Sequence, residues 1–514
     1  MAGRPIQIVR LDKKSNGLEI NIDALAEICL NEKCRDRPLC VVSIAGDFRK
    51  GKSFMLNFFL RYLYHICDKQ KEADGDWIGD PNSELKGFSW RGGSKPETTG
   101  ILVWSDPIVV KRPDGQEVAV LLMDTQGAFD SRQTIGQTAI IFALSTLTSS
   151  TQIYNVMNNI QEDNLQILDT FVAYGQLVLD KSSEKPFQKL CFLVRDWRSP
   201  SDHSYGAKGG LSLLEEKLQI DTEDPDSSDN KTRKRIDSCF ETKTCFLLPY
   251  PGEKVSVDEE GTFKGQICDM KDNFVEKLRE FVPMVLGPEN LLVKKIGGET
   301  VNGQSLLEYF RVYSETFKGE KIPEARNLYE ATAEASNLAA IANCKNFYQE
   351  SMKDICGAKK PYINPKILEQ KHNQLLRESM NMFENTKKLG GEDYSKTFSD
   401  NLLKDLVSSF EEFNAMNNSK NMFNIWGSPL ILLCFWFLAF TFSRLFEIIG
   451  IGPLANLFYL QATICFLSII VYLGLKYTGN FPDVVVAVDK VAEYCWLRAM
   501  DTAIGHVTNR VQNN

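Results

Sequence analysis

The chain has 514 residues, of which 43% are hydrophobic and 25% charged, so it can form roughly three domains with buried cores. Its net charge of −8 argues against a general nucleic-acid-binding protein, and we expect no nucleic-acid partner. The thirteen cysteines form no C-x-x-C pair and there are only four histidines, which predicts reduced thiols facing the cytosol and no structural zinc.

The first part of the chain, residues 1 to about 318, alternates short apolar runs with helical patterns and therefore predicts an α/β domain. Residues 1–14 are polar and basic and lack the apolar core of a signal peptide. Helical patterns follow the apolar runs, which favours a mostly parallel sheet covered on both faces. The expected strands are Cys40–Ala45, Ile101–Trp104, Val118–Met123, Lys189–Val194 and Cys245–Leu248.

A phosphate-binding pattern, G-x-x-x-x-G-K-[ST], runs from Gly46 to Ser53 as Gly-Asp-Phe-Arg-Lys-Gly-Lys-Ser. It follows the apolar run 41–45 and precedes a helical pattern over 54–64. Strand, glycine turn and helix N-terminus are the context that a P-loop needs. The alternative is a basic loop that happens to contain glycines.

Each residue type in this loop has a chemical reason to be there. Gly46 and Gly51 let backbone N–H groups face anionic oxygens, and the following helix N-terminus adds positive dipole. We expect Lys52 to reach the β- and γ-phosphates and Ser53 to bind Mg²⁺. The residues predicted to contact the nucleotide are Gly46, Asp47, Phe48, Arg49, Lys50, Gly51, Lys52, Ser53 and Phe54.

Two further segments predict γ-phosphate and metal contacts. The threonine-bearing segment 91–100 suits a switch loop that is ordered when γ-phosphate and Mg²⁺ are present. Both Thr98 and Thr99 could reach the metal, and we favour Thr98. The buried run 120–123 ends in Asp124-Thr125-Gln126-Gly127, so that Asp124 can hold the Mg²⁺ shell through water and Gly127 can donate a backbone N–H to the γ-phosphate.

The base-reading residue is less clear, because no N-K-x-D motif is present: Asn230-Lys231 is followed at the required spacing by Arg233. The apolar run 192–194 ends instead in Arg195-Asp196. A carboxylate at a strand end can accept both N1–H and N2–H of guanine. Asp196 is the expected guanine reader, and an ordinary surface ion pair with Arg195 is the alternative.

From about Pro323 the pattern changes to long helices. Gly357 should stop the first helix, Asn364-Pro365 should start the second, and Gly390-Gly391 should end it. Three helices with short loops predict an antiparallel bundle over 325–420. The expected inward residues are Leu328, Ala331, Ala335, Leu338, Ala342 and Met352, then Leu368, Leu375 and Met382, then Phe398, Leu402, Leu406, Phe410 and Phe413.

A hydrophobic zone over 425–475 follows the bundle. Its second segment, 454–475, is long enough to cross a hydrocarbon core of about 30 Å, whereas the first, 429–442, is short unless it extends to 425 and 446. The short connection predicts a hairpin whose ends share one side. That side should be cytosolic, because the nucleotide is cytosolic. Deep entry without full crossing, and two buried helices of a soluble domain, are the alternatives.

The remaining residues, 476–514, should form a cytosolic tail with an amphipathic helix over about 481–507. Next to a membrane anchor such a helix is expected in the lipid interface, and the alternative is a helix packed on the protein. The apolar face comprises Val484, Val488, Val491, Cys495 and Trp496.

Taken together, these motifs resemble those of the atlastins, membrane-anchored GTPases of the dynamin superfamily. The resemblance rests on the P-loop Gly46–Ser53, the switch Trp90–Gly100, Asp124–Gly127, and Arg195-Asp196 in place of N-K-x-D. It extends over nearly the whole chain through Ala331–Ala335, the paired apolar segments and the tail. The related guanylate-binding proteins share the GTPase motifs but lack such a hairpin.

The resemblance implies a GTPase that uses GTP and Mg²⁺, with Arg49 as an arginine finger in cis and with Lys52 and Thr98 as its other catalytic residues. A surface ion pair is the alternative for Arg49. The family usually has a small residue at the position of Asp47, whose carboxylate should repel phosphate unless it points away or pairs with a cation. Domains are expected at 1–318 (GTPase), 319–324 (linker), 325–420 (bundle), 425–475 (hairpin) and 476–514 (tail).

The resemblance further implies homotypic fusion of endoplasmic reticulum tubules by a multi-pass protein of that membrane, with both termini cytosolic. The expected partners are a second copy in cis and in trans, the lipid bilayer and ER-shaping hairpin proteins. One rival is a GTP-dependent tether or tubule-shaping scaffold without fusion activity. The other is a host-defence GTPase, which would predict a lipid-modified peripheral chain, and neither a C-a-a-X box nor a myristoylation site is present.

Overall fold

A computed structural model describes residues 3–11, 18–47, 50–67, 76–90, 100–127, 135–169, 185–222, 224, 227–257, 262–317, 325–420, 422–478, 481, 483–485, 487–492 and 494. By packing, the chain divides into two compact units. One comprises Met1–Asn346 with Ser379–Leu403, and the other comprises Phe347–Glu378 with Lys404–Asn514.

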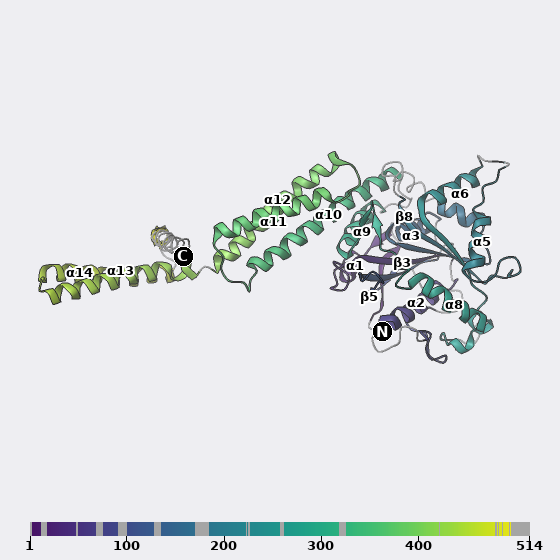
Figure 1. The fold of residues 1–514 in the computed structure, drawn as a ribbon, viewed down its shortest axis with the longest axis horizontal. Helices are drawn as coiled ribbons and strands as arrows, with labels where there is room; N and C mark the ends of the chain where they lie inside the picture. Colours follow the sequence, from purple (N-terminus) through teal and green to yellow (C-terminus); the bar gives the residue numbers. More distant parts are fainter. Residues whose placement is uncertain are drawn as a thin grey trace, which may run out of the picture. The chain divides into compact units, whose positions relative to one another are not determined.

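The first unit is built on a mixed sheet, which holds nine strands among the described residues (Figure 1). Their order is β2-β1-β4-β6-β3-β7-β8-β9, with β5 paired to β6. The neighbours β6, β3, β7, β8 and β9 are parallel, whereas β1, β2, β4 and β5 pair antiparallel. The strands are β1 (Pro5–Leu11), β2 (Leu18–Ile20), β3 (Leu39–Gly46), β4 (Ile101–Trp104), β5 (Ile108–Lys111), β6 (Glu117–Thr125), β7 (Thr151–Met157), β8 (Phe187–Arg195) and β9 (Phe240–Leu247).

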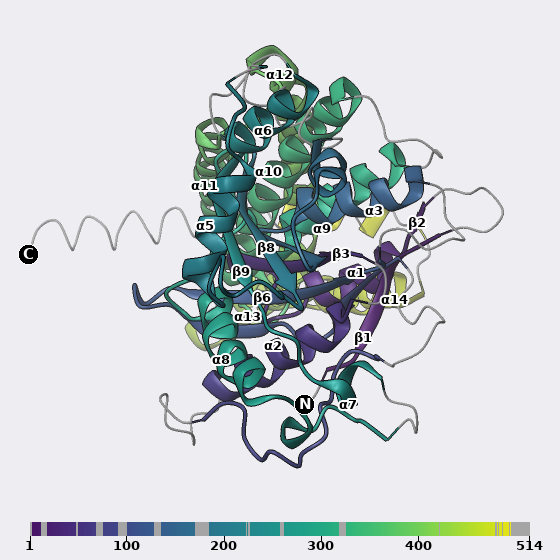
Figure 2. The ribbon, with the colours of Figure 1, turned by 90° about the vertical axis from the view of Figure 1, so that its right-hand side faces the viewer.

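Helices cover both faces of this sheet, as predicted. Alternate residues of β3 enter different cores: Val41 belongs to one hydrophobic cluster and Val42 to the other. In Figure 2, α3 and α9 lie above the strands and α2 and α8 below them. The helices of this unit are α1 (Ile22–Cys29), α2 (Lys52–Cys67), α3 (Ile135–Thr148), α5 (Ala207–Lys217), α6 (Ser228–Cys239), α7 (Glu253–Ser256), α8 (Asp272–Leu286) and α9 (Gly303–Thr316), and the short strands β10 (Lys295–Ile296) and β11 (Glu299–Thr300) follow α8.

All five expected strands are present, and the sequence predicts neither the four other strands of this sheet, β1, β2, β5 and β7, nor the short pair β10 and β11. The strand β7 carries Gln152 and Asn155, whose side chains are buried and hydrogen-bonded. Because these residues are polar, the segment lacks the continuous apolar run by which a central strand is predicted. The strand β1 lies within residues 1–14, whose polar and basic composition predicts no strand, although β1 buries Ile8 and Val9. The α/β class with a mostly parallel central sheet is confirmed.

Three long helices follow: α10 (Ala325–Cys356), α11 (Pro365–Asn385) and α12 (Glu392–Ser419). Two predicted boundaries are confirmed, because α10 stops before Gly357 and α11 begins at Pro365, where Asn364 caps it by accepting from the Lys366 N–H at 2.9 Å. The third is wrong, because α11 already ends at Asn385 and Gly390-Gly391 directly precede α12. The prediction of an inward side chain is wrong for Met382, which is 40% exposed. A strict seven-residue step drifts by about 20° per heptad on a straight helix, and Met382 is two steps beyond the buried Leu368.

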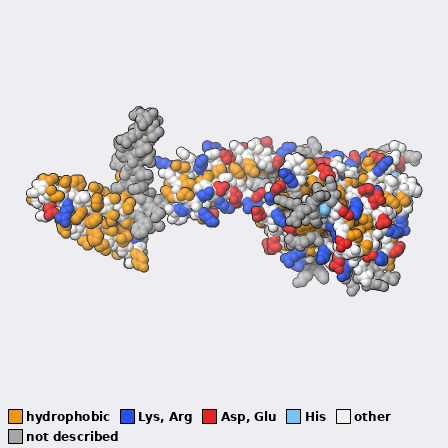
Figure 3. All heavy atoms as spheres, turned by 60° about the horizontal axis from the view of Figure 1, so that its bottom comes forward, with side chains coloured by type: hydrophobic (Ala, Val, Ile, Leu, Met, Phe, Trp, Pro, Cys, Tyr) orange, Lys and Arg blue, Asp and Glu red, His pale blue; other side chains and the backbone are white. Residues whose placement is uncertain are grey.

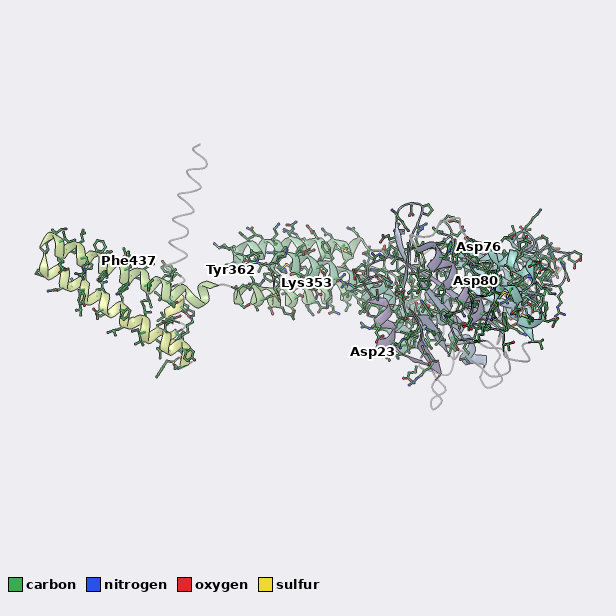
Figure 4. All side chains as sticks on the ribbon, turned by 90° about the horizontal axis from the view of Figure 1, so that it is seen from below. Asp23, Asp76, Asp80, Lys353, Tyr362 and Phe437 are labelled. Atoms are coloured by element: carbon green, nitrogen blue, oxygen red, sulfur yellow. The ribbon has the colours of Figure 1, made fainter. Side chains whose placement is uncertain are left out.

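Two apolar helices, α13 (Met422–Ile449) and α14 (Gly452–Thr478), fit a membrane hairpin. Their apolar spans of 23 and 27 residues correspond to about 35 and 40 Å, longer than the hydrocarbon core. Only 17% and 11% of the respective windows are buried, which argues against core helices of a soluble domain. Hydrophobic side chains gather over this region in Figure 3, and Phe437 lies on the outside of the hairpin in Figure 4.

Packing between these two helices uses small residues and a tight turn. Ala455, Ala462 and Ile469 are buried at seven-residue spacing, and the Ser443 hydroxyl donates to the Ala455 carbonyl at 3.0 Å. At the turn, Gly450 has φ +85°, and the Ile451 N–H donates to the Phe446 carbonyl, which is a Schellman end. The short connection predicted from the sequence is therefore confirmed.

Candidate nucleotide site

The predicted nucleotide residues converge at the carboxyl ends of the parallel strands. Gly46 ends β3, Asp124 lies at the end of β6, and Arg195 ends β8. The register places Ile44 beside Asp124, and Gly46 beside Asn155 of β7. Ligands of open α/β sheets bind at this edge, so the topology brings together motifs that are distant in sequence.

The loop after β3 has the backbone of a phosphate cradle. Gly46 has φ +137° and Gly51 φ +72°, values that L side chains rarely adopt. A Cβ on Gly46 would lie 2.0 Å from the Asn155 carbonyl oxygen, so only glycine fits there. The helix α2 begins at Lys52 and offers its N-terminus to an anion.

Lys52 is buried and turns back onto the loop. Its Nζ donates to the carbonyl oxygens of Asp47 at 2.8 Å and of Gly46 at 3.3 Å. Burial lowers the pKa of Lys52 to about 8, and Asp124 and Asp47 act in the opposite direction. A cation whose hydrogen bonds go to backbone carbonyl groups in this way is well suited to exchange them for phosphate oxygens.

Two of the three predicted magnesium ligands meet directly: the Ser53 hydroxyl donates to Oδ2 of Asp124 at 2.6 Å. A hydroxyl and a carboxylate are hard oxygen ligands of the kind Mg²⁺ prefers, so these residues fit that ion. Gly127 is buried after the same strand. Burial raises the pKa of the Asp47 carboxyl, while Lys52 and Lys50 act in the opposite direction and supply the positive charge that it needs.

Arg195 supports the loop from β8. Its Nη1 donates to the carbonyl oxygens of Lys50 at 3.3 Å and Gly51 at 3.4 Å, and its guanidinium lies 5.9 Å from the ring centre of Phe274. The adjacent Asp196 has φ +55°, a strained value for a residue other than glycine. Burial raises the pKa of Asp196, against the charges of Arg195, Arg198 and Lys50.

The residues after Asp196 are firmly tied to the fold. The Trp197 N–H donates to the Leu248 carbonyl at 3.0 Å, and its indole Nε1 donates to the His203 carbonyl at 2.8 Å. The His203 ring in turn contacts Ser212 at 3.2 Å and Glu216 at 3.0 Å, both on α5. Asp196 is thus anchored from its C-terminal side.

Two supporting residues went unassigned in the sequence. Asn155, fully buried, donates from Nδ2 to the Lys50 carbonyl at 3.0 Å, and its own carbonyl accepts from the Asp47 N–H at 3.3 Å. Gln126 accepts from the Gly100 N–H at 2.6 Å through its side chain and donates to the Gly100 carbonyl through its backbone. These two hydrogen bonds fix the position of Gly100, the residue that follows segment 91–99. A polar residue at the end of a buried strand is the signal that could have found Asn155.

The side chains of Phe54 and Asn230 contact other parts of the fold. The Phe54 ring is buried against Trp90 and Phe263, so its backbone N–H is the group left to face a nucleotide. The Asn230 side chain bonds the backbone of Asp221 and Asp224 through both its oxygen and its nitrogen, so it has a structural role and does not read the base. Phe48, Arg49, Thr98 and Thr99 lie outside the described residues.

Comparison with known proteins agrees with this site. Residues 15–295 match the family model described as guanylate-binding protein, N-terminal domain. Atlastin-3 of Homo sapiens is 43% identical over 99% of this chain and 92% of its own length. Atlastin-2 of Homo sapiens is 42% identical (96% and 83%), and Atlastin-1 of Macaca fascicularis is 40% identical (96% and 86%). The chain therefore belongs to the atlastin family of the dynamin superfamily, and it is an enzyme that hydrolyses GTP.

Proposed function

We propose that this protein fuses endoplasmic reticulum tubules by pairing its GTPase domains across opposing membranes. The observation that carries the proposal is the presence in one chain of a built nucleotide site and two long, exposed apolar helices. The similarity to atlastins over 99% of the chain supports the same organisation. Both termini are cytosolic in this proposal, because the nucleotide site needs cytosolic GTP.

At the site, the P-loop N–H groups and Lys52 bind the phosphates of GTP, and Asp196 reads the guanine edge. Ser53, Thr98 and, through water, Asp124 would hold Mg²⁺, which when bound would neutralise phosphate charge. Arg49 turns onto the phosphates when two GTPase domains pair, and such a finger is worth about 10³–10⁵ in rate. The contacts of Lys52, Ser53 and Asp124 support these roles.

The remaining domains bring the two opposing membranes together once the GTPase domains have paired. The bundle 325–420 swings about the linker 319–324, the hairpin 425–475 anchors it, and the tail 476–514 perturbs lipid packing. A second copy is the partner in cis and in trans, with ER-shaping hairpin proteins as further partners in the same membrane. Hydrolysis and phosphate release reset the cycle.

The test reconstitutes the full chain in liposomes and follows lipid mixing with GTP, with GDP and without nucleotide. Mixing only with GTP, absent in Arg49→Ala, supports the proposal. Lys52→Ala is the binding-deficient control, and we expect it to lose nucleotide affinity and mixing together. Turnover and vesicle clustering without mixing would favour the tether instead.

The guanine assignment has its own test. Asp196→Asn should lower the preference for GTP over ATP, because an amide cannot accept from both guanine N–H groups. Competition binding with the two nucleotides measures the ratio, and an unchanged ratio would move the role to another residue.

A further inference from the structure

Polar side chains from three segments of the second unit converge on one carboxylate, that of Asp489. Ser428 of α13 and Tyr472 of α14 both donate their hydroxyl to Oδ1 of Asp489. Lys476 of α14 donates to Oδ2 at 3.3 Å and to the Tyr472 hydroxyl at 2.6 Å. Both hairpin helices and the segment that follows them therefore meet at this cluster.

The two hydroxyl donors of the cluster are buried, whereas its charged members are partly exposed: the side chains of Lys476 and Asp489 are 29% and 35% exposed. Ser428 and Tyr472 are each 4% exposed, although most of both apolar helices is exposed. Ala492, one helical turn after Asp489, is also buried, at 5% exposed. The partly exposed carboxylate of Asp489 accepts from two hydroxyls and an ammonium group, and losing it removes this acceptor from the buried Ser428 and Tyr472.

The described part of the tail presents two different faces. Residues 483–485 and 487–492 are helical. Val485, Asp489 and Ala492 are half-buried or buried and recur at helical spacing, so they share one face. Val484 and Val491 are 50% and 64% exposed and lie seven residues apart on another face. One face thus packs on the hairpin and leaves an apolar face open.

We propose that Asp489 is a positioning residue that clamps the tail helix to the base of the hairpin and turns the face of Val484 and Val491 toward lipid. The clamp fixes both the place at which the tail enters the interface and the face that enters it. When the hairpin moves, the tail helix then moves with it. The inference rests on the proposed membrane anchorage of α13 and α14.

The experiment measures tail release in liposomes that contain the full chain with a C-terminal epitope tag and no nucleotide. Trypsin cleavage after Lys490 reports how often the tail helix opens. Because Asp489 adjoins the cleaved bond, each rate is divided by that of the same variant unfolded in denaturant. We expect Asp489→Ala to accelerate this normalised cleavage about tenfold, since a charge-assisted cluster is lost. The matched control is Asp483→Ala, an exposed carboxylate of the same segment, which should cleave at the wild-type rate.

Partner variants separate a clamp from a merely disturbed helix. Ser428→Ala combined with Tyr472→Phe should accelerate cleavage as Asp489→Ala does, and adding Asp489→Ala to that pair should change little more. Additive effects, or wild-type cleavage in Asp489→Ala, would overturn the clamp. GTP turnover should stay at the wild-type rate in Asp489→Ala while lipid mixing falls several-fold.

The two readouts also distinguish this inference from the proposed function. If wild-type chain does not mix lipids but Asp489→Ala still releases the tail, the fusion proposal fails and the clamp stands. If wild-type chain mixes lipids and Asp489→Ala neither releases the tail nor slows mixing, the clamp fails and fusion stands.

Discussion

At the scale of single residues, the nucleotide site is held by a buried cation poised to exchange partners. Lys52 donates to two loop carbonyls and has a pKa of about 8 because burial disfavours its charge. Phosphate oxygens would replace the carbonyl groups with full negative charge and raise the pKa again. Protonation of Lys52 and nucleotide binding are therefore linked.

This linkage predicts proton uptake on GTP binding. Above pH 8 the free protein holds Lys52 increasingly neutral, whereas the complex keeps it charged. Uptake should increase as the pH rises through about 8, and affinity should fall as the pH rises further. Calorimetric titration in buffers of different ionisation enthalpy measures the uptake. Lys50→Arg, at an exposed neighbouring position, should leave it unchanged. Absence of uptake at pH 8.5 would refute the link.

Asn155 gives a second prediction at this scale. Asn155→Ala removes the bond from Nδ2 to the Lys50 carbonyl and loosens the loop, so GTP affinity should fall about tenfold, equivalent to about 1.4 kcal/mol. Asn230→Ala is the control, because that buried asparagine also bonds backbone carbonyls, but those of Asp221 and Asp224 outside the P-loop. It should cost stability and leave affinity alone. Equal affinities for Asn155→Ala and wild type would contradict the supporting role.

At the scale of elements, the sequence predicts those features that depend on residues close together in the chain, such as helix ends and apolar strands. Gly357 and Pro365 mark helix boundaries because their backbone constraints are intrinsic to the residue. The strands found in advance were those with uninterrupted apolar runs. The strand β7 escaped because its polar side chains are satisfied by partners elsewhere in the chain. The contacts of Asn155 and Arg195 to the P-loop escaped for the same reason, since only strand register brings them there.

The helices of the second unit meet around a buried histidine, which yields a pH prediction. His372 of α11 lies 2.7 Å from the Tyr348 hydroxyl of α10 and stacks on Phe410 of α12 at 4.0 Å. Burial lowers the pKa of His372, against the opposing effect of Glu369. The unfolded helices therefore take up the proton more readily, so local stability is present at neutral pH and is lost as pH falls below about 6.5.

Hydrogen exchange of α11 in the full chain measures this effect. Opening of α11 should be several-fold more frequent at pH 5.5 than at pH 7.5, after correction for intrinsic exchange rates. His372→Gln should remove the pH dependence, because it cannot gain the charge. His203→Gln, in the first unit, should retain it. Equal pH dependence in His372→Gln and wild type would assign the effect to another group.

At the scale of the whole molecule, a GTPase domain, long helices and an apolar hairpin follow one another in the order expected from the sequence. Composition and spacing could predict the two apolar segments, but not whether both are long enough to cross a bilayer. The structure extends the first helix back to Met422 and on to Ile449, because residues outside the continuous apolar run also adopt helical backbone. Full crossing of both helices is then geometrically permitted.

Full crossing would place the turn between α13 and α14 on the side opposite both termini, and the chain carries its own topology reporters. Asn230-Lys231-Thr232 and Asn417-Asn418-Ser419 are N-glycosylation acceptors in the part proposed to be cytosolic. Expressed in microsomes, the chain should gain no glycan at either acceptor. A polar loop carrying an additional acceptor, inserted after Gly450, should gain one because it reaches the lumen. An unmodified loop would mean that the hairpin enters without crossing, and glycans at Asn230 or Asn417 would mean that the orientation is inverted.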